Sequence, residues 1–220
     1  MRLVERDYAL LRELDRWRWA LSRHIRYLGE FSGQRTCDRR LKLLIEAGYI
    51  DRKHVLYGIP ALYFVTHKGK VLEGLSLKAD KFKVEQITHD IAVLDTVIYF
   101  LLKHQVPLAA ITTEKQLHQR DGFGIRKHRP DFVFLLDGKN HCVEVELTPK
   151  AKTRMGKILQ DNFMAYDYQN WIVPHTQIKI RQMLSDNAAV CPNIAVLDLA
   201  EVVDFVKQYG QRGEGWDVVR

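Results

Sequence analysis

Three acidic residues stand at alternating positions in two strand-like runs of the second half of the chain. Asp131 opens the run 131–136, and Glu144 and Glu146 lie in the run 141–147. Successive side chains of a strand point to opposite faces, so all three carboxylates are expected on one face of a hairpin. Clustered carboxylates repel one another, and a divalent cation would remove that cost. The spacing therefore predicts an Mg²⁺ or Mn²⁺ site formed by Asp131, Glu144 and Glu146.

The hairpin that would carry this site is predicted to turn over residues 137–140, which begin with an Asp-Gly pair. If Asp137 pairs with Asn140, Asp131 lies opposite Glu146 and Val133 lies opposite Glu144. Two other readings stay open, namely acids at a solvated strand end and acids paired with Arg154 or Lys157.

Elements around the hairpin follow the order expected of an α/β layer with a mixed sheet. Apolar periodicity predicts a strand and then the two hairpin strands, followed by alternating helices and strands. The predicted segments are strand 109–113, helix 149–168, strand 171–173, helix 177–187, strand 194–199 and helix 200–209.

Charge is distributed unevenly along the chain. Residues 1–80 contain 16 Lys and Arg against 10 Asp and Glu, whereas the whole chain contains 34 against 27. Nearly all the excess positive charge therefore lies in the first third, which suggests that this part meets a polyanion. A basic surface that serves only solubility is the alternative.

The first third has the pattern of a winged helix-turn-helix. Helices are predicted over 5–18, 21–28 and 34–47, followed by strands 49–53 and 61–66. Cations of the third helix would enter a DNA groove, and those of the following ribbon would touch the backbone. The helix residues are Arg35, Arg39, Arg40 and Lys42, and the ribbon residues are Arg52, Lys53 and His54.

Domain boundaries follow from these patterns. We expect a DNA-binding domain over 1–75, a linker over 76–83, a second domain over 84–209 and a tail over 210–220. The amphipathic helix expected over 84–104 could pack within the chain or pair with a second copy in a homodimer. The three scattered cysteines and the lack of a long apolar stretch predict a cytoplasmic protein that spans no membrane.

The motifs "RDYALLREL", "RRLKLLIEAGYI", "THDIAVLDT", "TTEKQL", "RPDFVFLLDG" and "VEVELTPKAKTR" occur in this order. In this the chain resembles the replication-relaxation family of plasmid and mobile-element proteins. The resemblance implies an α+β protein with a winged helix followed by a PD-(D/E)xK, restriction-endonuclease-like domain. Asp131 and Glu144 match the metal-binding acids of that signature. Glu146 stands where such nucleases place a lysine, so the resemblance offers Lys150 or Lys152 as a substitute for that lysine and Glu114 as a fourth acid.

Two functions are compatible with this resemblance. In one, the winged helix selects double-stranded DNA, and a catalytic site of Asp131, Glu144, Glu146 and Lys150 nicks or cleaves it with a divalent metal. In the other, a degenerate nuclease fold makes the protein a non-enzymatic regulator or accessory factor in plasmid replication or conjugative transfer. Other replication or transfer proteins would then be its partners.

Overall fold

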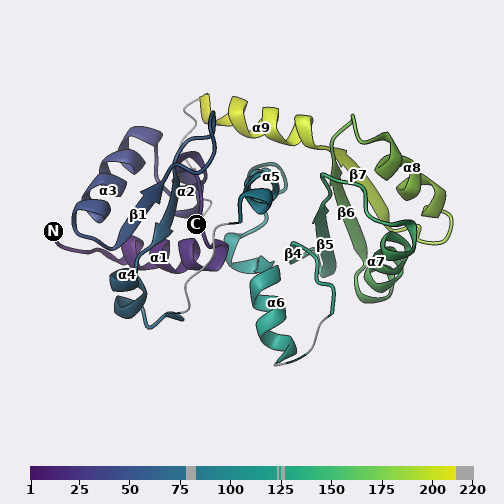
Figure 1. The fold of residues 1–220 in the computed structure, drawn as a ribbon, viewed down its shortest axis with the longest axis horizontal. Coiled ribbons are helices and arrows are strands. Elements are labelled where there is room, and N and C mark those ends of the chain that lie inside the picture. The colour runs from purple at the N-terminus through teal and green to yellow at the C-terminus, as the bar shows by residue number, and fades with distance from the viewer. Residues whose placement is uncertain (78–82, 123, 125–126, 212–220) are drawn as a thin grey trace. The chain divides into compact units, whose positions relative to one another are not determined.

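The structure is a computed structural model, and it describes residues 1–77, 83–122, 124 and 127–211 (Figure 1). Two compact units divide the chain, one comprising Met1–Leu94 with the end of the last helix from Tyr209, the other comprising Asp95–Gln208. Most of the predicted linker 76–83 and of the predicted tail 210–220 falls on residues 78–82 and 212–220, which lie outside the described residues.

The first unit contains three helices, a two-stranded antiparallel sheet and a short fourth helix among its described residues. Leu10, Leu11 and Leu14 of α1 are fully buried, as the helical period of the sequence predicts. The sheet pairs Ile50 with Val65 and Lys53 with Leu62, and Ala20 forms a further bridge to Tyr63. The elements are α1 (Glu5–Trp17), α2 (Ser22–Leu28), α3 (Gln34–Glu46), β1 (Ile50–Lys53), β2 (Leu62–Val65) and α4 (His67–Leu72).

Helix α5 (Val84–Lys103) begins in the first unit and ends in the second. Ile87, in its first turns, is fully buried in a cluster with Trp19, Leu21 and Leu62. Because these apolar contacts hold the start of α5 to the first unit, the division falls within the helix. The sequence had placed it at the polar segment 76–83.

The second unit is built on a five-stranded mixed sheet of order β3-β4-β5-β6-β7. β3, β4 and β5 are antiparallel neighbours, whereas β5, β6 and β7 are parallel. The described chain is therefore α+β. The remaining elements are η1 (Leu108–Ala110), β3 (Thr112–Thr113), α6 (Glu114–Asp121), β4 (Phe132–Leu136), β5 (Lys139–Val145), α7 (Lys152–Ala165), β6 (Tyr168–Val173), α8 (Ile178–Asn187), β7 (Ile194–Asp198) and α9 (Leu199–Gln211).

Helices cover both faces of this sheet within the second unit (Figure 1). On one face, Trp171 packs with Leu159 of α7 and Leu184 of α8. On the other face, the ring of Phe100 in α5 lies 5.1 Å from that of Phe134, centroid to centroid. Both layers are needed because the central strands are apolar on both faces.

Several details of the sequence prediction were wrong. Helices α4 and α6 were not predicted, because both are short and polar and have almost no apolar period. They begin at Thr66 and Thr113, whose side chains accept hydrogen bonds from the first turn of each helix. The strand predicted over 109–113 is a 3-10 turn followed by the two-residue β3, and β6 begins three residues earlier than expected.

Candidate functional site

The β4–β5 hairpin turns through only two residues, Asp137 and Gly138, which have φ angles of 49° and 73°. Positive φ at both positions is the type I′ geometry that matches the twist of the strands. Leu136 pairs with Lys139, so the register differs by two residues from the predicted pairing of Asp137 with Asn140. Val133 therefore faces Cys142, and the ladder ends at Phe132 and Val143, one residue before Asp131 and Glu144.

A shift of two residues leaves every side chain on the face that was predicted for it, since strands alternate with period two. Asp131 and Glu146 lie one residue outside β4 and β5, and Asp131 is close enough to Glu144 to raise the pKa of its carboxyl. Both glutamates are buried, each with 4% of its surface exposed. Their surroundings decide what they can do.

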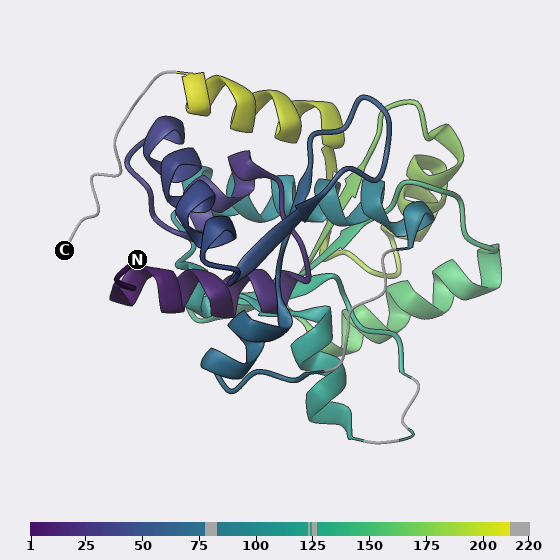
Figure 2. The same ribbon diagram turned by 60° about the vertical axis from the view of Figure 1, so that its left-hand side comes forward.

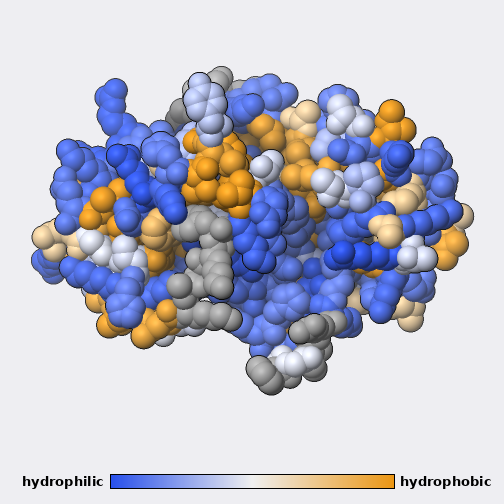
Figure 3. Space-filling model, in the orientation of Figure 1, coloured by the Kyte–Doolittle hydropathy of each residue, from blue (hydrophilic) through white to orange (hydrophobic). Residues whose placement is uncertain are grey.

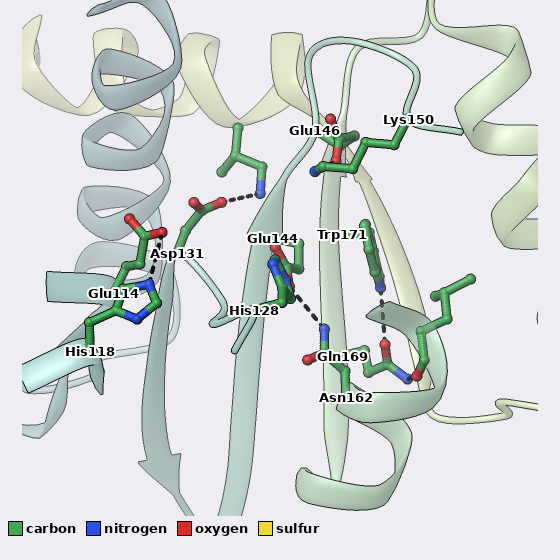
Figure 4. A network of polar contacts seen from close by, with 12 residues as sticks. Glu114, His118, His128, Asp131, Glu144, Glu146, Lys150, Asn162, Gln169 and Trp171 are labelled. Atoms are coloured by element: carbon green, nitrogen blue, oxygen red, sulfur yellow. Dashed lines mark hydrogen bonds and ion pairs between the residues drawn. The ribbon is translucent and has the colours of Figure 1, made fainter. Parts of the chain in front are cut away.

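Asp131 is fastened to the neighbouring strand by its side chain and its backbone. The N–H of Val145 donates to Asp131 Oδ2 at 2.7 Å, and the N–H of Asp131 donates to the carbonyl of Val143 at 3.1 Å. The carbonyl of Asp131 accepts from the N–H of Glu114 at 2.9 Å. Glu114 itself points toward His118, 3.6 Å away (Figure 4).

Glu144 lies between two polar side chains of other elements (Figure 4). Its Oε1 is 2.7 Å from Nε2 of His128 and accepts from Nδ2 of Asn162, in α7, at 2.9 Å. Burial raises the pKa of the Glu144 carboxyl above its ordinary value, the contact with His128 lowers it, and the charge of Asp131 raises it further. This carboxyl therefore resists ionisation more than a solvated glutamate.

Glu146 forms an ion pair with Lys150, in the segment between β5 and α7 (Figure 4). Burial lowers the pKa of the Lys150 ammonium, whereas the charges of Glu144 and Asp131 raise it. The structure thus brings Lys150 into the electrostatic neighbourhood of all three carboxylates. Lys152, the other lysine that the sequence offered, begins α7 and is exposed.

The residues present do not fit the divalent cation that the resemblance implies. Glu146 is paired with Lys150, while Glu144 is held by His128 and Asn162. A metal site requires ionised carboxylates whose oxygens converge. Within the described residues, no group of three or more His, Cys, Asp or Glu side chains is arranged to hold a metal ion.

Three of the predicted DNA-binding cations form an exposed stripe along α3. Arg35, Arg39 and Lys42 follow one another at intervals of four and three residues, which places them on one face of the helix. Arg35 and Arg39 have no ion-pair partner in the part of the chain that the structure describes. Lys42, with 78% of its side chain exposed, forms an ion pair with Glu46 at 3.9 Å. Figure 3 shows mainly hydrophilic residues where α3 lies in Figure 1.

Arg40, the fourth predicted cation of α3, points away from this stripe. Its Nε donates to Oδ1 of Asp7 in α1 at 2.7 Å, and its Nη2 contacts Oδ2 of the same carboxylate. Only 21% of the Arg40 side chain is exposed, and 1% of that of Asp7. The arginine therefore joins α1 to α3 within the first unit, where α3 runs at an angle to α1 (Figure 2).

The predicted ribbon cations lie at one end of the two-stranded sheet. Arg52 and Lys53 are the last residues of β1, His54 follows, and all three are exposed. The connection to β2 continues through Tyr57, which is fully exposed.

Sequence reasoning missed His128 and Asn162, the two partners of Glu144. They lie 16 and 18 residues from it, and neither belongs to a spacing that marks a site. Asn162 stands on the buried face of α7 among Met155, Ile158 and Leu159. A polar residue at an apolar helix position was the only available signal.

No family model matches the chain, and a search of curated proteins finds no match. In the described part of the chain, no helix combines the length and the apolar character that crossing a membrane requires.

Proposed function

We propose that this chain binds double-stranded DNA through its first unit, with α3 in the major groove and the end of β1 on the phosphate backbone. The single observation that carries the proposal is the exposed stripe of Arg35, Arg39 and Lys42. Three cations at helical spacing match the charge and the width of a groove that admits one α-helix. The order of α1, α2, α3, β1 and β2 supports a winged helix-turn-helix.

The test is the salt dependence of binding to a labelled, mixed-sequence DNA duplex. Replacing Arg35 and Arg39 by alanine removes two contacts, and each lost phosphate contact should reduce the slope of log K against log salt by about 0.9. Arg12→Ala is the matched control, because Arg12 lies on α1 and is already paired with Glu73. An unchanged slope in the double variant would remove α3 from the interface.

For the second unit we propose a degenerate member of the nuclease-like class, which serves DNA binding in replication or transfer of a mobile element without cutting. The order of helix α5, strands β3, β4 and β5 with α6 between the first two, helix α7 and strand β6 supports the class. The partners of Glu144 and Glu146 favour the non-enzymatic alternative, because they occupy the carboxylates that catalysis would need.

A supercoiled plasmid with Mg²⁺ or Mn²⁺ separates this alternative from a nuclease. We expect no nicking by the purified chain. Nicking that disappears when Asp131 and Glu144 are both replaced by alanine would assign the cleavage to this hairpin and make the second unit an enzyme. Nicking that survives the replacement would show that Asp131 and Glu144 are not its active site.

A further inference from the structure

Three polar contacts fix the segment that precedes α1. The N–H of Val4 donates to Asp7 Oδ2 at 2.7 Å, and the N–H of Asp7 donates to the carbonyl of Val4 at 2.8 Å. The third contact comes from α3, where Nη2 of Arg40 donates to the carbonyl of Arg2 at 3.1 Å. Residues 2–4 are therefore held against α3 by the same Arg40–Asp7 pair that joins the two helices.

Arg40 and Asp7 form an ion pair that is largely shielded from solvent. An ionised carboxylate that is almost completely buried requires charged hydrogen-bond partners, and the planar guanidinium offers Asp7 two parallel ones. The hydrogen bonds to Asp7 also raise the pKa of Arg40, which keeps the guanidinium charged. Arg40 is thus committed to Asp7 and to Arg2, and reaching a phosphate would cost it both contacts.

The position of Arg40 places Arg2 beside the cationic stripe. Successive helical residues are turned by about 100°, so Arg40 lies on the flank of α3 next to Arg39 and faces α1. Arg2, whose carbonyl it holds, is exposed. The neighbouring acid Glu5 forms an ion pair with Arg12, with 3.6 Å between Oε1 and Nη2.

We infer that Arg40 positions Arg2 as an additional contact to a DNA phosphate on the α1 side of the groove, and does not itself touch DNA. This inference rests on the proposed binding of DNA by α3. Phosphates border the groove on either side of an inserted helix, so an exposed arginine fixed at the helix flank adds affinity independent of sequence. The interface would then extend from α3 to the segment before α1.

Two variants distinguish this positioning role of Arg40 from direct contact with DNA. For the first variant, the two roles predict changes of opposite sign in the affinity for DNA. Asp7→Asn keeps the shape of the side chain but removes the charge that holds Arg40. If Arg40 positions Arg2, the variant should bind the labelled duplex more weakly, by roughly three- to tenfold at moderate salt. If Arg40 touched DNA, releasing it from Asp7 would strengthen binding and would overturn the inference.

Arg2→Ala is the second variant. Because Arg2 is exposed, this replacement should leave the protein folded even if the Asp7→Asn variant unfolds. We expect the salt slope to fall by about 0.9, with little further effect when Asp7→Asn is added. If Arg39→Ala weakens binding and Arg2→Ala does not, this inference fails and the proposed function stands. If neither weakens binding, the proposed function fails as well.

Discussion

His128 and Glu144, 16 residues apart in the chain, meet with 2.7 Å between Nε2 and Oε1. β5 carries the glutamate into the interior of the second unit, where 4% of its surface remains exposed. A buried carboxyl whose side-chain hydrogen-bond partners, among the described residues, are one imidazole and one amide is poorly compensated when it ionises. The contact therefore makes stability depend on pH.

Glu144→Gln should stabilise the protein progressively as the pH rises. A carboxyl whose pKa is raised by folding binds its proton more tightly in the folded state. Its contribution to stability is complete below its ordinary pKa and is lost as the pH rises through the folded pKa. The glutamine stays neutral and still accepts from Asn162, so it avoids this loss.

Urea unfolding between about pH 4 and about pH 8 measures the effect. The gap between variant and wild type should widen toward high pH, and a constant gap would contradict the prediction. Repeating the comparison in a His128→Gln background removes the titration of the imidazole itself.

Gly69→Ala should destabilise the first unit. A Cβ built on Gly69, in α4, would lie 2.3 Å from the carbonyl oxygen of Tyr49 and 2.7 Å from Cγ1 of Val65. Relieving such overlap moves backbone and should cost about 1–3 kcal/mol in the free energy of unfolding. Gly156→Ala, in α7, is the control, since its Cβ meets nothing within 4 Å. It should stabilise by roughly 0.5–1 kcal/mol in thermal unfolding.

Trp171→Ala should cost about 3–5 kcal/mol. The indole is fully buried between α7 and α8, and its Nε1 donates to Oε1 of Gln169 at 3.3 Å. Trp171→Phe, which keeps most of the apolar volume, should lose clearly less. Ile178→Ala, at a side chain that is 74% exposed on α8, should change the unfolding free energy by less than about 0.5 kcal/mol. Equal losses for Trp171→Ala and Ile178→Ala would contradict this packing.

The three cysteines should not react with a thiol reagent in the folded protein. Cys37, Cys142 and Cys191 are all buried, and burial raises the pKa of each thiol, that of Cys37 to about 12. The thiolate is the reactive form, so labelling at about pH 8 should be slow. When the reagent is added to the denatured chain, mass spectrometry should find all three cysteines labelled. Rapid labelling of any one cysteine in the folded chain would contradict the prediction and indicate local opening around that residue.

Local patterns in the sequence determined the elements and the faces of the strands. Apolar periodicity located α1, α2, α3 and the central strands to within a few residues. Period-two alternation predicted a common face for Asp131, Glu144 and Glu146, and the two-residue error in the predicted register leaves that prediction unchanged. The stripe of Arg35, Arg39 and Lys42 was equally predictable, since helical spacing alone fixes a common face.

Tertiary structure alone decided which charges remain available. Arg35, Arg39 and Arg40 are equivalent in the sequence, yet Arg40 is bound to Asp7, 33 residues away. Glu146 and Glu144 look like a pair of metal ligands, yet one is matched by Lys150 and the other by His128 and Asn162. Whether a charged side chain remains available depends on the residues that pack against it, and the packing of distant segments leaves no periodic signal in the sequence.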